Sequence, residues 1–478
     1  MFTTILAGRL AGLRVALFGS LLGLALLLLP ANAWAGSHTV YVAPPNGVDD
    51  TANIQAALNA CVAYGKSCTV QLQAGTYHTK QLVTYNFHGT FKGMGQANTT
   101  IEALPNLYVN FKQDNYESLC QPNTTTCFWP SVVIFVNGDI SVSDLSIYIS
   151  APPGTATTTW IFGGVPYIGL LDALSFIGQH VNATVDRIHM EGLPDPTNTV
   201  FGFNVVNALH FTGEFPRSLT DWDWYFLSGS LTVRNSSFST AFVGISQDGF
   251  VKSSRITIGG SSSTGNHLEN GYGGIDIEAS ENSVFEISYN ESSGVGAGMW
   301  VVPWQPVFVP TSPSWYSIHD NTFIGTAQNA DGMYLYDDAT NPWIQAAVWN
   351  NNAEVQATLS EGIGVYNTKG TAVWNNTVTG SDGYDGIGLW NSSQDTVIGN
   401  NVSGFTVDPT GYAQIYLDPY TTYDVVLCSN PSNTVLNQGT NNVVIGCQQL
   451  DPAAKSVSPA DSKRSLGLQK GKPWLRQP

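Results

Sequence analysis

Basic residues are scarce in this chain of 478 residues, which holds 18 Lys and Arg against 35 Asp and Glu and has a formal charge of −17. The stretch 36–450 holds ten Lys and Arg against 33 Asp and Glu, a formal charge near −23. Nucleic acids and anionic membranes are bound through many contacts from Lys and Arg to phosphate. The composition therefore excludes nucleic acid as a partner.

Long apolar runs are absent except near the start of the chain. There, Val15 to Leu29 is almost wholly apolar, follows two arginines, and precedes Ala33-Trp34-Ala35, which has the form of a cleavage site. Residues 1–35 are thus predicted to be a secretory signal peptide. An uncleaved anchor is the alternative, although it needs about 20 apolar residues. We expect a secreted protein (extracellular, periplasmic or on the cell surface) with no membrane segment after cleavage.

Cysteine is also rare, and no two cysteines form a C-x-x-C pair. The six fall into three pairs that are close in sequence, Cys61 with Cys68, Cys120 with Cys127, and Cys428 with Cys447. An even number behind a signal peptide favours disulfides, whereas structural zinc sites use closer pairs. We predict three disulfides and an oxidising compartment.

Helical spacing occurs in one clear stretch. Within 50–62, behind Asp50 or Thr51 as the N-cap, apolar residues recur on one helical face at Ile54, Ala57, Leu58 and Cys61. A short amphipathic helix of this kind can cover the open end of a repetitive β-structure. We therefore predict that it is an N-terminal cap.

One pattern is repeated between Gly274 and Asp418. Each copy reads Gly, an alternating apolar strand, a polar turn, a second strand, Asn and Gly, and four copies begin at Gly274, Gly332, Gly362 and Gly386. A repeat of about 20 to 50 residues with strands and no helix indicates units that stack to bury a continuous core. The sequence therefore predicts an all-β fold, a parallel β-helix.

A column of asparagines supports this register. Asn290, Asn321, Asn376 and Asn400 each precede a glycine by four residues. Asn tolerates the left-handed conformation of a tight corner, and stacked amides can bond one another. We predict an Asn ladder at one corner of the coils. The β-helix domain is expected to span 36–450, and the polar, basic segment 451–478 is expected to be a disordered tail.

Strand residues alternate between the interior and the outside. The interior positions are aliphatic, namely Ile245, Ile275, Ile277, Met299, Val301, Met333, Leu335, Ile363, Val365, Ile387 and Leu389. The outward positions hold acidic residues and then aromatic ones, the latter being Trp300, Tyr334, Tyr336, Tyr366, Trp390 and Tyr416. Since stacked coils lie about 4.8 Å apart, these residues would form a stripe of roughly 30 Å.

The aromatic stripe suits an extended polysaccharide, because sugar rings stack on aromatic faces. Gly364 and Gly388 lie beside Tyr366 and Trp390 and are expected to leave those rings uncovered. The alternative is that the aromatic residues pack on one another for stability alone.

Three acidic residues are the candidates for catalysis. Asp276 and Glu278 lie two apart on one strand, and Asp248 lies one coil earlier. Separations of about 5 to 9 Å are accessible to them, a range that covers both geometries of glycoside hydrolysis. His267 is the alternative base. No cofactor is certain, but Ca²⁺ could be held by Asp337 and Asp338, or by Asp276 and Glu278.

Near the predicted cap, the phrase DDTANIQAAL is followed by QLQAGTY and FKGMGQANTTI. With the later coils, these phrases resemble the pectate-lyase-like superfamily of single-stranded right-handed parallel β-helices. That superfamily includes polygalacturonases, pectate lyases, alginate epimerases and lyases, phage tailspikes and noncatalytic surface proteins. The polygalacturonase phrase N-T-D is replaced by Gly271-Tyr272-Gly273, and the motifs G-H-G and D-P-H-D are absent.

Two functional hypotheses follow. The first is a polysaccharide-degrading enzyme, a glycosidase or less readily a lyase or epimerase, which uses the clustered acids. The second is a noncatalytic surface or adhesion protein whose stripe binds a glycan or a partner protein.

Overall fold

The computed structural model describes residues 38–104, 131–150, 159–162, 165–168, 172–194, 205, 207–212, 227–248, 251–278, 280–302, 312–326, 330–337, 342–356, 360–381, 384–405 and 412–451. Apart from His38, these residues belong to one compact unit, Thr39–Pro478. The predicted signal peptide, the Cys120–Cys127 pair, Asp338 and the predicted tail beyond residue 451 lie outside the described residues.

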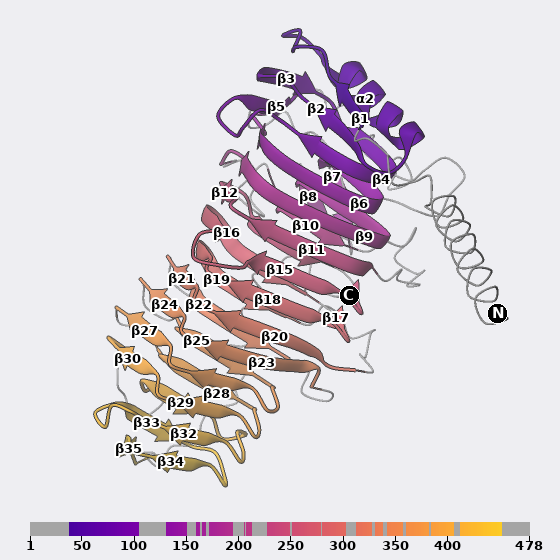
Figure 1. Ribbon diagram of the computed structural model, residues 1–478. Helices are drawn as coiled ribbons and strands as arrows, with labels where there is room; N and C mark the ends of the chain where they lie inside the picture. The colour runs from indigo at the N-terminus through magenta and orange to yellow at the C-terminus, as the bar shows by residue number, and fades with distance from the viewer. Residues whose placement is uncertain are drawn as a thin grey trace, which may run out of the picture. The chain divides into compact units, whose positions relative to one another are not determined.

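The described chain is a right-handed parallel β-helix, as predicted. Nearly all of its strands join one continuous parallel sheet of 31 strands, which bends into three faces (Figure 1). The first face is built from β4 (Leu82–Lys92), β6 (Ser131–Tyr148), β9 (Asp172–Glu191), β10 (Asn207–Thr212), β13 (Val243–Asp248), β16 (His267–Ile277), β19 (Glu291–Val301), β22 (Asp331–Tyr336), β25 (Ile363–Tyr366), β28 (Ile387–Trp390), β31 (Ile415–Leu417), β33 (Thr434–Asn437) and β35 (Gln448–Leu450).

The other faces use separate strands and the remaining lengths of the long ones. The second face adds β2 (Cys68–Gln71), β11 (Ser228–Arg234), β15 (Arg255–Gly259), β18 (Val284–Ser288), β20 (Ser314–His319), β23 (Ile344–Trp349), β26 (Ala372–Trp374), β29 (Thr396–Ile398), β32 (Val425–Leu427) and β34 (Val443–Ile445). The third face adds β3 (Gly75–Thr79), β5 (Thr99–Ala103), β12 (Ser237–Ser239), β21 (Thr322–Gly325), β24 (Asn352–Val355), β27 (Thr377–Gly380) and β30 (Asn401–Ser403). The remaining strands are β1 (His38–Tyr41), which pairs with β2, the antiparallel pair β7 (Thr159–Phe162) and β8 (Val165–Ile168), and the short pair β14 (Val251–Lys252) and β17 (Ser280–Glu281).

The core is a set of aliphatic columns that run from coil to coil. On the first face, the strand register aligns twelve buried side chains in succession: Leu82, Val133, Leu174, Leu209, Ile245, Ile275, Met299, Met333, Ile363, Ile387, Ile415 and Val435. Because parallel strands keep equivalent side chains in line, each coil buries the apolar side of the next. The interior positions predicted from the alternation are all buried.

The helix α2 (Thr51–Tyr64) covers the first coils. It buries Ile54, Ala57, Leu58 and Cys61, the residues predicted from the helical spacing. Asp50 occupies the N-cap position, but its side chain makes no capping bond and its Oδ1 instead accepts from the Asn46 amide at 3.0 Å. The predicted disulfides Cys61–Cys68 and Cys428–Cys447 are formed.

The predicted Asn ladder is present and is longer than expected. It runs through Asn266, Asn290, Asn321, Asn351, Asn376 and Asn400, each Nδ2 donating to the Oδ1 of the next at 2.9 to 3.0 Å. All six of these amides also donate to a backbone carbonyl of a preceding coil, at 2.8 to 3.0 Å. The ladder therefore satisfies buried backbone groups at this corner.

Replacing Asn351 by Ala should lower the free energy of unfolding by about 3 kcal/mol, because it leaves several buried partners without bonds. Asn351 Nδ2 donates to Ile318 O at 2.9 Å, and its Oδ1 accepts from both nitrogens of Asn321 at 3.0 Å. Urea denaturation measures the change. Asn401→Ala is the matched control, since its exposed side chain lies outside the ladder. Equal stability of the two variants would contradict this role.

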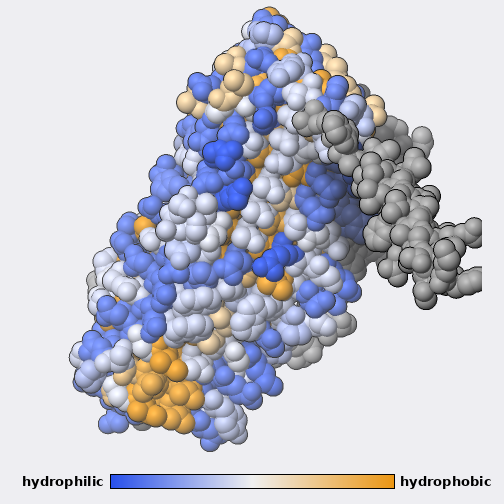
Figure 2. Space-filling view, in the orientation of Figure 1, coloured by the Kyte–Doolittle hydropathy of each residue, from blue (hydrophilic) through white to orange (hydrophobic). Residues whose placement is uncertain are grey.

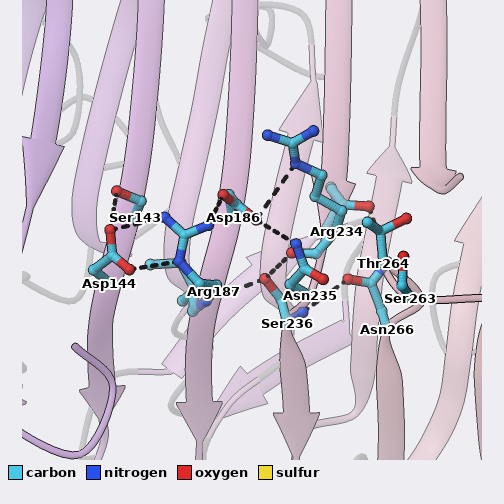
Figure 3. A network of polar contacts seen from close by, with 12 residues as sticks. Ser143, Asp144, Asp186, Arg187, Arg234, Asn235, Ser236, Ser263, Thr264 and Asn266 are labelled. Atoms are coloured by element: carbon cyan, nitrogen blue, oxygen red, sulfur yellow. Dashed lines mark hydrogen bonds and ion pairs between the residues drawn. The ribbon is translucent and has the colours of Figure 1, made fainter. Parts of the chain in front are cut away.

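Two of the few arginines are held by carboxylates at another corner (Figure 3). Arg187 donates to Asp144 from Nε at 2.6 Å and from Nη2 at 3.0 Å, and it also contacts Asp186. Arg234 Nε lies 3.4 Å from the other oxygen of Asp186. These guanidinium groups are thus neutralised locally.

Exposed apolar side chains gather on the last coils of the second face. Ile398, Leu427 and Ile445 align in one column of β29, β32 and β34, and each is at least one third exposed. Figure 2 shows this area in orange at the lower left. The exposed apolar area thus lies on a different face from the predicted carbohydrate stripe.

Candidate functional site

The outward side of the first face forms one continuous column of polar and aromatic residues. Strand register aligns, in order, Ser175, His210, Ser246, Asp276, Trp300, Tyr334, Gly364, Gly388 and Tyr416. A neighbouring column aligns Tyr336, Tyr366 and Trp390. The structure therefore brings the predicted aromatic residues together.

These aromatic residues are more buried than the sequence predicted. Trp300, Tyr366 and Tyr416 are 1%, 7% and 3% exposed, whereas Tyr334, Tyr336 and Trp390 are half-buried. Rings on successive coils pack against each other, as in Tyr366 and Trp390, whose centroids lie 5.9 Å apart with planes 6° from parallel. Because the coil spacing is close to a ring-stacking distance, the rings cover one another.

The two glycines beside the rings have a different role from the one predicted. A Cβ at Gly364 would lie 2.5 Å from Glu361 Oε2, and one at Gly388 would lie 2.6 Å from Trp390 Nε1. For Tyr366 the prediction of an uncovered ring is wrong, since this residue is 7% exposed. Trp390, whose indole occupies the space over Gly388, is half-buried.

Glu361 lies at the centre of this region. Its Oε2 accepts from the Tyr366 hydroxyl at 2.7 Å, and its Oε1 accepts from Trp390 Nε1 at 3.0 Å. Burial raises the pKa of Glu361 to about 7, although both hydrogen bonds act to lower it. A carboxyl group of this kind can hold a proton at neutral pH and release it to a reacting oxygen.

Asp331 and Asp385 lie in the coils on either side of Glu361. Asp331 Oδ1 accepts from the Glu361 amide, and Asp385 Oδ1 accepts from the Ala413 amide, both at 2.9 Å. The Oδ2 atom of each is buried and has no hydrogen-bond partner in the described part of the chain. Burial, together with the charge of Glu361, raises the pKa of both aspartates. We call these three residues the acid cluster.

The sequence contains a signal for the acid cluster that the alternation of strand positions did not use. An acid directly precedes the repeat glycine in three successive copies, at Asp331, Glu361 and Asp385. These positions come before the regular alternation begins, so they were assigned to neither the interior nor the outside. Glu361 is directed to the outward side of the first face, where its carboxyl group meets Tyr366 and Trp390.

The predicted catalytic pair lies near one end of the acid cluster. Asp276 and Glu278 are each 2% exposed. The pKa of Tyr334 is raised mainly by burial and next by the charges of Asp276 and Asp331. Tyr334 thus lies between the predicted pair and the acid cluster. The catalytic role of Asp276 and Glu278 stays a prediction.

The other two predicted catalytic residues differ in their position relative to this pair. Asp248 ends β13 and directly follows Gln247, the register partner of Ile277, so its backbone lies beside that of Glu278. His267 lies on the third face, with Nε2 3.3 Å from Glu269 and Nδ1 3.4 Å from Glu291. Since β16 passes from the third face to the first between residues 267 and 276, His267 does not face the Asp276 carboxyl group.

The predicted calcium ligand Asp337 has a structural role. Its two oxygens accept from the backbone amides of Trp343 and Ile344 at 2.8 to 3.0 Å, and the residue is fully buried. These bonds use three of the about four acceptor positions of the carboxylate. Across the described ranges, no group of three or more His, Cys, Asp or Glu side chains is placed to hold a metal ion.

Comparison with known proteins supports the fold. A family model described as periplasmic copper-binding protein (NosD) matches residues 228–430. No curated protein sequence matches the chain. No helix among the described residues is long and apolar enough to cross a membrane.

Several solved structures are similar to the chain at low sequence identity. The mannuronan C-5 epimerase AlgE6 A-module of Azotobacter vinelandii has a TM-score of 0.52 and 15% identity, covering 85% of this chain and 96% of its own. The GH87 α-1,3-glucanase catalytic unit of Streptomyces thermodiastaticus has a TM-score of 0.47 and 12% identity, covering 88% and 71%. DFA-IIIase of Arthrobacter chlorophenolicus has a TM-score of 0.45 and 12% identity, covering 88% and 99%. Together with the strand register, the similarity to the AlgE6 A-module shows that the chain has the single-stranded right-handed parallel β-helix fold.

Proposed function

We propose that the chain is a secreted, carbohydrate-active protein that hydrolyses a polysaccharide bound along the first face, with Glu361 as the general acid. The observation that carries this proposal is the environment of Glu361, a buried carboxyl group with a pKa of about 7 held by Tyr366 and Trp390. Glycoside hydrolysis needs one protonated carboxyl group to donate to the leaving oxygen and one carboxylate to attack or to activate water. The acid cluster offers both.

The spacing of the acid cluster supports these roles. Neighbouring coils lie about 4.8 Å apart, so carboxyl groups one or two coils apart fall in the range of about 5 to 9.5 Å used by retaining and inverting glycosidases. Asp331 or Asp385 is then the second carboxyl group. When one member of such a group ionises, it raises the pKa of its neighbours, so the protons are shared.

The charge of the region favours an uncharged glycan. Burial and neighbouring acids raise the pKa of the acid cluster, and no Lys or Arg contributes to lowering it. From Val233 onward to residue 450, the sequence holds only Arg234, Lys252, Arg255 and Lys369. A polyuronate would bring carboxylates beside buried carboxyl groups with no cation to offset them. We therefore propose a neutral polysaccharide as substrate.

The predicted pair Asp276 and Glu278 has a place in this proposal. It lies on the same outward face, beyond Tyr334 from the acid cluster. We propose that the glycan extends over Tyr334 toward this pair. Its carboxyl groups are then either hydrogen-bonding partners for sugar hydroxyls or a second catalytic pair.

The noncatalytic hypothesis also has an observation in its favour. The aromatic rings cover one another, as in Trp300 and Tyr334 with planes 17° apart, so part of the stripe serves packing. A protein of this kind would bind a glycan or partner through the half-buried Tyr336 and Trp390 and would turn over no substrate.

Copper and calcium have no part in the proposal. The matched family is described as copper-binding, but the described residues do not fit a metal site, since no suitable group of ligands is assembled. The periplasmic description of that family and the predicted signal peptide both support a location outside the cytoplasm.

Incubation with a panel of neutral and uronic-acid polysaccharides tests the proposal. We expect new reducing ends from a neutral glycan, and no rise in absorbance near 235 nm, because hydrolysis forms no unsaturated product. A rise in absorbance would indicate elimination and contradict the proposed chemistry. Absence of both signals, with retarded migration in a gel that contains the glycan, would favour the noncatalytic hypothesis.

A further inference from the structure

The outward column of the second face becomes aliphatic and more exposed toward the last coil. The strand register aligns His319, Trp349, Trp374, Ile398, Leu427 and Ile445. The first three rings stack, with centroids 4.2 and 5.0 Å apart and planes 16° and 5° from parallel, so each ring covers the next. The last three side chains are 36%, 39% and 53% exposed. Exposure of this column therefore increases toward the end of the β-helix.

The exposed aliphatic side chains lie on the last strands of the face. Val443 stands two residues before Ile445 on β34, faces the same side and is 47% exposed. We call Ile398, Leu427, Val443 and Ile445 the apolar patch, which lies in the orange area of Figure 2.

The apolar patch reaches an edge of the sheet. β34 pairs with β32, and no described strand follows β34 on the second face. Proteins protect edge strands with charged side chains or with a covering segment, because an exposed apolar edge pairs with other chains. The patch holds no charged side chain, so a covering segment is the protection that remains. At the other end of the β-helix, α2 has this role for the first coils.

The path of the last coil leads the chain toward the apolar patch. In the preceding coil, the turn 438–442 carries the chain from β33 on the first face to β34 on the second. β35 repeats the position of β33, since Leu450 is the register partner of Leu436. Asp451 follows Leu450 as Asn437 follows Leu436, so the residues after Asp451 start from the corner that leads to the second face.

The sequence of 452–478 is complementary to the body of the protein in charge. It holds six basic residues and one acidic residue, a formal charge of +5, whereas 36–450 has a formal charge near −23. Opposite charges attract within a Debye length of about 8 Å at physiological salt. The basic segment is therefore held near the acidic coils from which it continues.

The same segment also contains apolar residues with the spacing of a strand. Leu466 and Leu468 alternate with polar residues and glycine, so in an extended chain both face one side. Trp474 and Leu475 follow shortly after them. A polar segment that is predicted to be disordered by itself can become ordered when it binds a surface.

We infer that the segment 465–475 binds the apolar patch of its own chain and covers the end of the second face, with Leu466 and Leu468 against Leu427 and Ile445. The length of the connection permits this, because 452–465 can span about 45 Å when extended. The patch extends over two coil spacings of about 4.8 Å each, roughly 10 Å. The inference concerns a different face from the proposed hydrolysis and does not depend on it.

Photocrosslinking of the full chain tests this inference. Leu468→p-benzoylphenylalanine places a group that inserts into neighbouring C–H bonds on irradiation, at a position outside the coils. We expect a crosslink within one chain, mapped by mass spectrometry to the strands β29, β32 and β34. Ile445→Asp should remove this crosslink, because a charge in the apolar patch opposes apolar contact. Val284→Asp is the matched control and should leave it unchanged, since Val284 is also an exposed valine of the second face, 40% exposed, but lies on β18.

Binding of the dye 1-anilinonaphthalene-8-sulfonate gives an independent measurement. Replacing Leu466 and Leu468 together by Ser should uncover the apolar patch and increase the fluorescence of the dye, and adding Ile445→Asp should cancel the increase. Val457→Ser, in the same segment but before residue 465, should cause no increase. Crosslinks that join two chains would assign the patch to a second copy and overturn the inference. Crosslinks that avoid the patch, or unchanged dye fluorescence in the double variant, would overturn it as well.

Discussion

Replacing Glu361 by Gln should reduce glycan hydrolysis by about 100-fold or more, the usual loss when a general acid is removed. The substitution preserves the shape of the side chain. Trp390 Nε1 can still donate to the amide oxygen, and the amide nitrogen can donate to the Tyr366 hydroxyl in place of the bond of 2.7 Å. Stability should therefore change little, and kcat/KM on the glycan found to be cleaved measures the effect.

The pH dependence of the wild-type enzyme should have the same origin. Glu361 must be protonated to act as the acid, so activity should fall as the pH rises through its pKa of about 7. The bond from Tyr366 lowers that pKa. Tyr366→Phe should consequently move the alkaline limb of the profile to higher pH, a shift that a purely structural role for Tyr366 would not produce.

Glu354→Gln is the matched control, because Glu354 lies on β24 of the third face. It should keep wild-type activity. If Glu361→Gln remained active while Asp276→Asn or Glu278→Gln did not, the catalytic centre would be at the pair predicted from the alternation. If none of these variants changed turnover, general acid catalysis on the first face would be wrong.

The sequence predicted the fold because the fold depends on repetition. Each coil must place an aliphatic residue over the last one, so Ile275, Met299 and Met333 recur at matching positions. The corner asparagines recur for the same reason, since each amide bonds the next. Asn351 was missed because no glycine follows it by four residues.

The candidate site was less predictable because it depends on departures from the repeat. Alternation identifies which side of a strand a residue faces, and it placed Asp276 and Trp300 in the correct column. It does not show that stacked rings bury one another, nor that Glu361 extends over Gly364. Asp337 accepts from backbone amides, and an acid in a turn has the same sequence appearance whether it binds a cation or backbone amides.

The protein should be more stable at pH 5 than at pH 8, the reverse of the usual effect of salt-bridged carboxylates. Burial raises the pKa of Asp395 and Glu361 to about 7 and that of Asp424 to about 6. In the unfolded chain these groups titrate near pH 4. Between those values the native state binds more protons than the unfolded state, so the free energy of unfolding falls as the pH rises.

The acids with lowered pKa act at a different pH. Arg187 lowers the pKa of Asp144, and Asn182 and His88 lower that of Asp139, so both groups stabilise the native state above about pH 4 and lose this effect only at lower pH. The side chains of Asp144 and Asp139 are 28% and 56% exposed, and this contact with water weakens the contribution. Between about pH 4 and pH 7, the buried acids therefore determine how the free energy of unfolding changes with pH. The loss across this range should be on the order of a few kcal/mol.

Asp395→Asn isolates one of these buried groups. Asp395 accepts from Thr371 N at 2.7 Å and from Thr368 Oγ1 at 2.5 Å, and an amide can keep the first bond and reverse the second. The variant should match the wild type at pH 5 and exceed its melting temperature at pH 8, because it cannot ionise. Asp139→Asn, at an exposed site, should leave the difference between the two pH values unchanged. A wild-type melting temperature that rises from pH 5 to pH 8 would mean that the buried carboxyl groups ionise without cost, and the protonated state inferred for Glu361 would lose its physical basis.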